Sequence, residues 1–334
     1  MLSGESGTSG RGAQSRAPDL AFARDVIEGL GCRPKRLPSK YFYDHRGTGL
    51  FDALCATPEY YLDRCETSLL KAHCRQLAEY IGDGANIVEI GGVDASKARV
   101  VLGALKNPQI YAPIHVSAPH LWSSAMQLQL AFPLLGVRPI LAEFMTLRAL
   151  PDDCTSGHDQ LTFFFFGSAY GTTFANFDPL AGVKLLRRCA TLAPHSLLII
   201  GVDLCKRHLV LERTYNDATG FAGEFNLNLL ARINRELHGD FNLEAFEHVA
   251  FFNEQCGRME MHLRSVRRQN VHIGDERFAF DKGEMVHTES SYKYTVGQFE
   301  RLARRANYVP MKVWIDPDWR FSLQVWRTAG DGFL

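Results

Sequence analysis

A turn between an expected strand and helix near residue 90 holds the first residues whose types and spacing could do chemistry. The stretch VEIGGVDASKAR, Val88 to Arg99, ends an apolar run in two glycines, and Lys97 follows on the expected helix. Such turns bring backbone N–H groups and a helix N-terminus close to a ligand, and a side chain at the turn can block that approach. Val93 stands where a G-x-G pattern would have its last glycine. The turn alone leaves two interpretations open, a nucleotide or S-adenosyl-L-methionine (SAM) site and a purely structural turn.

Alternating strand and helix patterns surround this turn. The short apolar runs are NIVEI, IYAPIHV, RPILAEF, LTFFFFG and SLLIIGVD, separated by helical segments such as ASKARVVLGALK and PLAGVKLLRRCATLA. This alternation predicts an α/β fold with a doubly wound, mainly parallel sheet covered on both faces. Ligands of such sheets sit at the carboxyl ends of the strands, which here are the turns beginning at Gly91, His115, Glu143 and Gly167.

The pattern changes after Asp203 and predicts a second unit. A helix, NLNLLARINRELHG, precedes RMEMHLRSV, in which Met259, Met261 and Leu263 alternate with polar residues as in a half-buried antiparallel strand. We expect a disordered tail at 1–18, an α+β domain from 19–65 and 205–293, and a Rossmann-like α/β domain from 66–204 and 294–334.

Composition excludes several classes of partner. The 334 residues contain 46% hydrophobic residues, and 37 Lys and Arg balance 37 Asp and Glu, so the chain lacks the basic footprint of a nucleic-acid-binding protein. The apolar runs are too short to span a bilayer, and the Gly- and Ser-rich start does not resemble a signal peptide. The eight cysteines show no zinc-binding spacing. We expect a cytoplasmic monomer with no metal, nucleic-acid or membrane partner.

Several longer motifs are more specific than the glycine turn. In chain order they are LPSKYFYDHRGTGLFD, PEYYLDR, FNLNLLARINRELHGDFNLEAFEHVAFFN, MEMHLRS and HTESSYKYT. Between Pro34 and Trp326 the chain resembles the histidine Nα-methyltransferase family, which begins ergothioneine biosynthesis. The resemblance implies a Rossmann-like SAM-binding domain joined to a domain that binds a free amino acid, and the stepwise transfer of three methyl groups to the α-amine.

The resemblance also implies an amino-acid pocket. Asn176 and Thr173, in GTTFANFDP, match residues at the α-amino and carboxylate groups, and Tyr215 matches a tyrosine that donates to the carboxylate. Glu289 and Ser291, in TESS, match the pair that holds the imidazole, whose two nitrogens need an acceptor and a group that donates or accepts. They are two residues apart, so both point to one face of a strand. The residues matching the pocket walls are Phe51, Tyr60 and Met261.

The cofactor side departs from the family pattern. The family's E-L-G-S-G-T-S-E-K-T-R is EIGGVDASKAR here, which keeps Gly91 and Lys97 but has Val93 at the second motif glycine. The aspartate that binds both ribose hydroxyls is replaced by His115, and a neutral imidazole cannot accept two hydrogen bonds. The acid beside the adenine is Glu143, followed by a retained Phe144.

Three functional hypotheses follow from this mixture. The first is an active SAM-dependent methyltransferase acting on the α-amine of a free amino acid such as histidine. In it Tyr43, which matches a tyrosine near both ligands, steers the proton from the amine through a water; the competing interpretation of Tyr43 is a packing residue between the domains. The second is a non-catalytic amino-acid-binding pseudo-methyltransferase. The third is a diverged member with an altered cofactor or a different SAM reaction.

Overall fold

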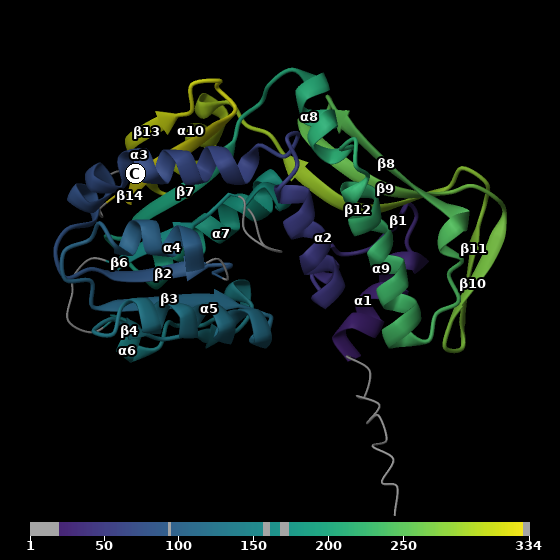
Figure 1. The fold of residues 1–334 in the computed structure, drawn as a ribbon, viewed down its shortest axis with the longest axis horizontal. Helices are drawn as coiled ribbons and strands as arrows, with labels where there is room; N and C mark the ends of the chain where they lie inside the picture. Colours follow the sequence, from purple (N-terminus) through teal and green to yellow (C-terminus); the bar gives the residue numbers. More distant parts are fainter. Residues whose placement is uncertain (1–19, 93–94, 156–160, 168–173, 330–334) are drawn as a thin grey trace, which may run out of the picture.

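The computed structural model describes residues 20–92, 95–155, 161–167 and 174–329, which form a mixed α/β fold. Figure 1 shows one large sheet with its helices on one side of the molecule, and a smaller sheet with a second group of helices on the other. No helix among these residues is long and apolar enough to cross a membrane.

The large sheet has eight strands in the order β13-β14-β7-β6-β2-β3-β4, with β5 also paired to β3. The strands from β2 to β7 pair in parallel, whereas β14 joins β7 antiparallel and β13 joins β14 antiparallel. The predicted mainly parallel sheet is therefore present. Its strands are β2 Asn86–Ile90, β3 Ile110–His115, β4 Gly136–Val137, β5 Ile140–Leu141, β6 Leu161–Phe165, β7 Leu197–Asp203, β13 Tyr308–Ile315 and β14 Phe321–Thr328.

Helices cover both faces of this sheet, as the run of four phenylalanines shows. Phe163 and Phe165 pack in the core beneath α7 and α10, while Phe164 and Phe166 pack in the core beneath α3, α4 and α5. Successive side chains of a strand alternate between faces, so an unbroken apolar run fits a strand buried on both. The helices are α3 Leu62–Ile81, α4 Ala95–Leu102, α5 Ala118–Ala131, α6 Asp152–Thr155, α7 Pro179–Leu192 and α10 Val296–Arg305, with the 3₁₀ turns η2 Phe144–Thr146 and η3 Phe174–Asn176.

The small sheet has the order β1-β12-β9-β8 and has a separate hydrophobic core, drawn from residues 22–62 and 211–286. Asp44 caps α2 by accepting from the N–H of Gly47, and it accepts a further hydrogen bond from Asn228 on α9. The elements are α1 Leu20–Gly31, β1 Lys35–Arg36, η1 Ser39–Phe42, α2 His45–Cys55, α8 His208–Tyr215, α9 Phe221–Leu237, η4 Leu243–Ala245, β8 Phe246–Asn253, β9 Arg258–Ser265, β10 Gln269–Ile273, β11 Glu276–Phe280 and β12 Met285–Tyr292.

Two expected strands need correction, and one expected domain boundary lies within a helix. The run RPILAEF forms only the two-residue strand β5, because Pro139 has no N–H to donate and separates β5 from β4. Helix α3 begins at Leu62, so the boundary expected at residue 65 falls inside a continuous helix. Strand β9 is buried on both faces, since Glu260 and His262 are enclosed as well as the methionines; Glu260 bonds His262 and Arg258, and the His262 ring stacks on Phe251.

Candidate functional site

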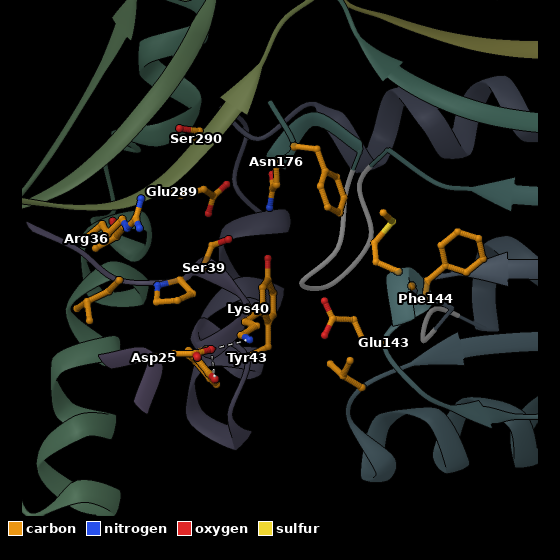
Figure 2. Close-up of a pocket in the computed structure, with 18 of the residues that line it drawn as sticks. Asp25, Arg36, Ser39, Lys40, Tyr43, Glu143, Phe144, Asn176, Glu289 and Ser290 are labelled. Atoms are coloured by element: carbon orange, nitrogen blue, oxygen red, sulfur yellow. Dashed lines mark hydrogen bonds and ion pairs between the residues drawn. The ribbon is translucent and has the colours of Figure 1, made fainter. Parts of the chain in front are cut away.

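A cavity of about 850 Å³ opens at the carboxyl ends of the parallel strands. Gly91, His115 and Glu143 line it, so three of the four turns expected to form a site meet there. Figure 2 shows Asn176, Lys40 and Tyr43 around its middle, with Glu143 and Phe144 on one side and Glu289, Arg36 and Asp25 on the other. The cavity therefore lies between the large sheet and the elements of the small one.

The glycine turn after β2 requires both of its glycines. Gly91 has a φ of 79°, a left-handed conformation that side chains disfavour, and its N–H donates to the carbonyl of Ile114 at 2.9 Å. A Cβ at Gly92 would lie 2.8 Å from the Cβ of Pro113. The turn thus exposes backbone at the cavity. Val93, where the family motif is altered, lies outside the described residues.

His115 ends β3 with 7% of its surface exposed, and its ring is held by the next turn. Its Nδ1 accepts from the backbone N–H of Ser117 at 3.0 Å. A neutral imidazole has one donor and one acceptor nitrogen, so the hydrogen must sit on Nε2. His115 can therefore donate from Nε2, where a carboxylate would accept.

Two neighbouring residues after β5 complete this side of the cavity. Glu143 is exposed and immediately precedes the turn η2. Phe144 is buried, with its ring centroid 6.3 Å from that of Phe163. The acid and the aromatic ring expected near the cofactor both line the cavity.

Lys97, which the sequence expectation grouped with the cofactor residues, lies on α4 and is paired with acids of α3. It is not among the described residues that line the cavity. Its ammonium is buried, 2.9 Å from the carboxylate of Asp63 and 3.1 Å from that of Glu66 on α3. The other oxygen of Glu66 accepts from the N–H of Gly167 at 2.6 Å. Lys97 thus neutralises an acid that fixes the turn after β6.

A smaller cavity of about 40 Å³ adjoins the large one, and Tyr43, Asn176 and Glu289 line both. The described residues expected to bind the substrate are brought together around it from separate segments, whereas Thr173 lies outside the described residues. These lining residues are Phe51, Tyr60, Asn176, Tyr215, Met261, Glu289 and Ser291, and the expected catalytic residue Tyr43 lines the cavity with them. Gly167, at the fourth turn expected to form a site, also lines it. The sequence interpretation missed further lining residues, namely Leu54, Leu62, Thr214, Ala222 and Phe225.

Strands β9 and β12 present the polar end of the small cavity. Glu289 and Ser291 lie two residues apart on β12, and both line the cavity as the alternation of a strand predicts. Glu289 pairs in register with Met261 on β9, just after an irregularity between His287 and Glu289. An acid, a hydroxyl and a thioether thus share one surface.

The carboxyl of Glu289 has an unusual proton affinity. Burial raises its pKa to about 7, and the nearby Lys293 ammonium opposes part of that rise. Burial also raises the pKa of Tyr60 and of Tyr215, so both phenols stay protonated near neutral pH. Glu289 is therefore the cavity acid whose charge changes near pH 7.

Tyr43 stands at the junction of the two cavities, directly after η1. Its ring packs edge-on against Phe51 at 5.4 Å and against Phe225 at 5.3 Å between centroids. The ring is thus a packing element, and the same residue lines both cavities. The two interpretations of Tyr43 are compatible.

Lys293 was missed by the sequence interpretation. It follows Ser291 by two residues in SSYK, and its ammonium contacts the Ser291 hydroxyl at 2.8 Å and the Tyr215 hydroxyl at 2.9 Å. The same period of two that paired Glu289 with Ser291 could have identified it.

Comparisons with known proteins found a family model and several curated relatives. A family model described as "Histidine-specific methyltransferase, SAM-dependent" matches residues 22–328. The chain is 34% identical over 316 residues to a histidine N-alpha-methyltransferase of Mycobacterium tuberculosis, covering 92% of this chain and 95% of that protein. It is 33% identical to a protein of the same description from Mycolicibacterium smegmatis, covering 91% and 94%. An ergothioneine biosynthesis protein 1 from Neurospora crassa is 26% identical, covering 84% of this chain and 32% of that protein.

Proposed function

Because the chain belongs to the family of SAM-dependent, histidine-specific methyltransferases, we propose that it transfers methyl groups from SAM to the α-amine of free histidine. The family expected from the sequence motifs is thereby confirmed. The observation that carries the proposal is the pair of adjoining cavities that share Tyr43, Asn176 and Glu289. In our proposal the large cavity takes the methyl donor and the small one takes the amino acid.

The division of hydrophobic cores supports a two-domain assignment. One core draws on residues 22–62 and 211–286, and the two cores of the large sheet draw on residues 69–202 and 292–326. We assign the first group to an α+β amino-acid-binding domain and the second to a Rossmann-like methyltransferase domain. The cavities then lie at the seam, where small-molecule sites commonly occur.

The residues at the strand ends fit SAM in our proposal. The turn after β2 brings the backbone of Gly91 to the large cavity. Glu143 is an acceptor, and Phe144 is an apolar ring beside it. His115 departs from the family pattern, because its Nε2 offers one donor in place of two acceptors.

Catalysis in this proposal is mainly positioning. SAM supplies an electrophilic methyl group on a sulfonium. The neutral α-nitrogen would form the new N–C bond as the methyl–sulfur bond breaks, and the ammonium so formed would give up a proton before any further transfer. Asn176 orients the amine at the junction of the cavities, and Tyr43 steers that proton toward solvent through a water. Phe51, Tyr60 and Met261 wall the substrate.

The proposal predicts a defined product. Purified protein incubated with histidine and SAM should yield histidine carrying added methyl groups on the α-nitrogen, with matching formation of S-adenosylhomocysteine. Mass spectrometry with fragmentation locates the methyl groups, and reactions without SAM or without protein are the controls. Methylation on the imidazole ring, or histidine binding with no methylated product, would contradict the proposal. The latter result would favour a non-catalytic amino-acid-binding protein.

A second prediction concerns the altered ribose contact. His115→Asp should tighten SAM binding about tenfold, because a carboxylate can accept from both ribose hydroxyls and charge-assisted hydrogen bonds contribute about 1.5–3 kcal/mol. Calorimetric titration with SAM measures the change, and methylation of histidine should rise at low SAM.

His120→Asn is the matched control for this substitution. Its imidazole contacts the hydroxyls of Thr48 and Ser117, and it is not among the described residues that line either cavity. It should leave SAM affinity unchanged. A His115→Asp protein that binds SAM more tightly but loses the wild-type activity would indicate that the chain uses a different cofactor or reaction.

A further inference from the structure

The buried ammonium of Lys293 joins two hydroxyls of the small cavity. Lys293 follows β12 directly, and its side chain has no exposed surface. Its Nζ lies 2.9 Å from the Tyr215 hydroxyl and 2.8 Å from the Ser291 hydroxyl. Both residues line the small cavity with Glu289. One cation therefore contacts two of the groups to which the proposed function assigns substrate recognition.

An aspartate of the large sheet keeps this cation charged. Asp203 ends β7, and its Oδ2 lies 2.6 Å from Lys293 Nζ. Its Oδ1 accepts from the Tyr61 hydroxyl at 2.7 Å and from the Lys206 ammonium at 2.5 Å. Burial by itself would lower the pKa of Lys293, but the Asp203 carboxylate holds that pKa above its ordinary value. Burial would likewise raise the pKa of Asp203, yet the two ammonium groups lower it.

The ammonium also fixes the direction of both hydroxyl groups. An ammonium donates hydrogen bonds and cannot accept them, so the oxygens of Tyr215 and Ser291 are the acceptors in both contacts. Each hydroxyl hydrogen must then point away from Lys293. Since both side chains line the small cavity, each hydroxyl hydrogen can point into it.

We propose that Lys293 is a positioning residue that selects the hydrogen-bonding pattern of the substrate. With Ser291 held as a donor, the ring nitrogen facing it must be the unprotonated one, and the ring N–H then faces Glu289. With Tyr215 held as a donor, the group facing it must be an acceptor, as a carboxylate is. The inference rests on the proposed function and adds to it the selection of one neutral imidazole tautomer.

Lys293 also acts on the acceptor at Glu289. Three phenols line the small cavity with Glu289, those of Tyr43, Tyr60 and Tyr215, and Lys293 is the ammonium whose charge acts on its carboxyl. Arg36 and Arg258 line the large cavity with Glu289. His287, two residues before Glu289 on β12, is neutral because burial lowers its pKa to about 4. Lys293 is the cation that opposes the effect of burial on Glu289. Its loss should therefore move the ionisation of Glu289 to higher pH.

Lys293→Met tests the inference through the kinetics of histidine methylation between about pH 6 and about pH 9. The KM for histidine at pH 7 should rise about tenfold or more, because two donors lose their orientation. The kcat/KM for histidine should still rise with pH, but the midpoint of that rise should move upward by about one pH unit. A shift of this size is typical when a carboxyl loses a nearby opposite charge. Lys206→Met is the matched control, since Lys206 pairs with Asp203 but contacts neither cavity hydroxyl. It should keep the wild-type KM and midpoint.

Circular dichroism and thermal melting establish that each variant is folded. If Lys293→Met does not fold, Lys293→Gln removes the same charge, keeps a polar side chain and leaves the Asp203–Lys206 pair in place, and the same shift of the midpoint is expected. A folded variant with the wild-type KM and midpoint would overturn the inference. An equal change in Lys206→Met would also overturn it, because the effect would then belong to the ion pair alone. A wild-type protein that does not methylate histidine would instead overturn the proposed function.

Discussion

Replacing Glu289 with alanine should lower kcat/KM for histidine about a hundredfold, because a buried imidazole N–H loses its charged acceptor. The side chain faces the small cavity beside Met261 and Ser291, so the loss falls on ring recognition. Amino acids without a ring N–H should lose far less. Steady-state kinetics with histidine and with a panel of other amino acids measure this selectivity.

The neighbouring serine provides the control for this prediction. The Ser290 hydroxyl forms a hydrogen bond with His287 Nε2, with 2.9 Å between the two atoms. Ser290 lines the large cavity and is not among the described residues that line the small one. Ser290→Ala should therefore keep the preference for histidine. Equal losses on every amino acid in Glu289→Ala would assign Glu289 a structural role.

Glu289→Gln separates the acceptor from its charge. Burial raises the pKa of Glu289 to about 7, so the wild-type carboxyl is protonated below that pH and ionised above it. Wild-type kcat/KM for histidine should rise through this range as the acceptor forms. The glutamine variant keeps an acceptor oxygen that does not titrate, so its profile should be flatter. If kcat/KM rises with pH equally in the wild type and in Glu289→Gln, a group other than Glu289 controls the pH dependence.

Replacing Asn176 with alanine should lower kcat about a hundredfold, the scale of a roughly 1 Å misplacement of the reacting group. Asn176 ends η3 and lines both cavities, and the proposed function places the meeting of the amine and the methyl donor there. The residue is only partly buried, and we expect a small change in melting temperature. Single-turnover kinetics distinguish a slower methyl transfer from weaker binding.

Asn270→Ala is the matched control for Asn176→Ala. Asn270 is exposed on β10, away from the residues that line either cavity. This variant should have the wild-type kcat. If Asn176→Ala raises only the KM for histidine and keeps kcat, Asn176 holds the amino acid without orienting its amine.

Local periodicity in the sequence was sufficient to predict much of the fold. The apolar run at Phe163 to Phe166 identified a strand buried on both faces, because alternation sends successive side chains to opposite sides. The spacing of Glu289 and Ser291 likewise placed both on one face of β12. The order of the longer motifs identified the family, whose model matches residues 22–328.

Contacts between side chains that are far apart in the sequence were revealed only by the tertiary structure. Lys97 belongs to the glycine motif, yet its charge is paired with acids of α3. Lys293 meets Tyr215 at a separation of 78 residues and Asp203 across two sheets. Periodicity specifies which face of an element a side chain occupies, but it carries no information about which distant element covers that face. The charged contacts that orient this site depend on which distant element covers each face. The packing of the whole chain determines that.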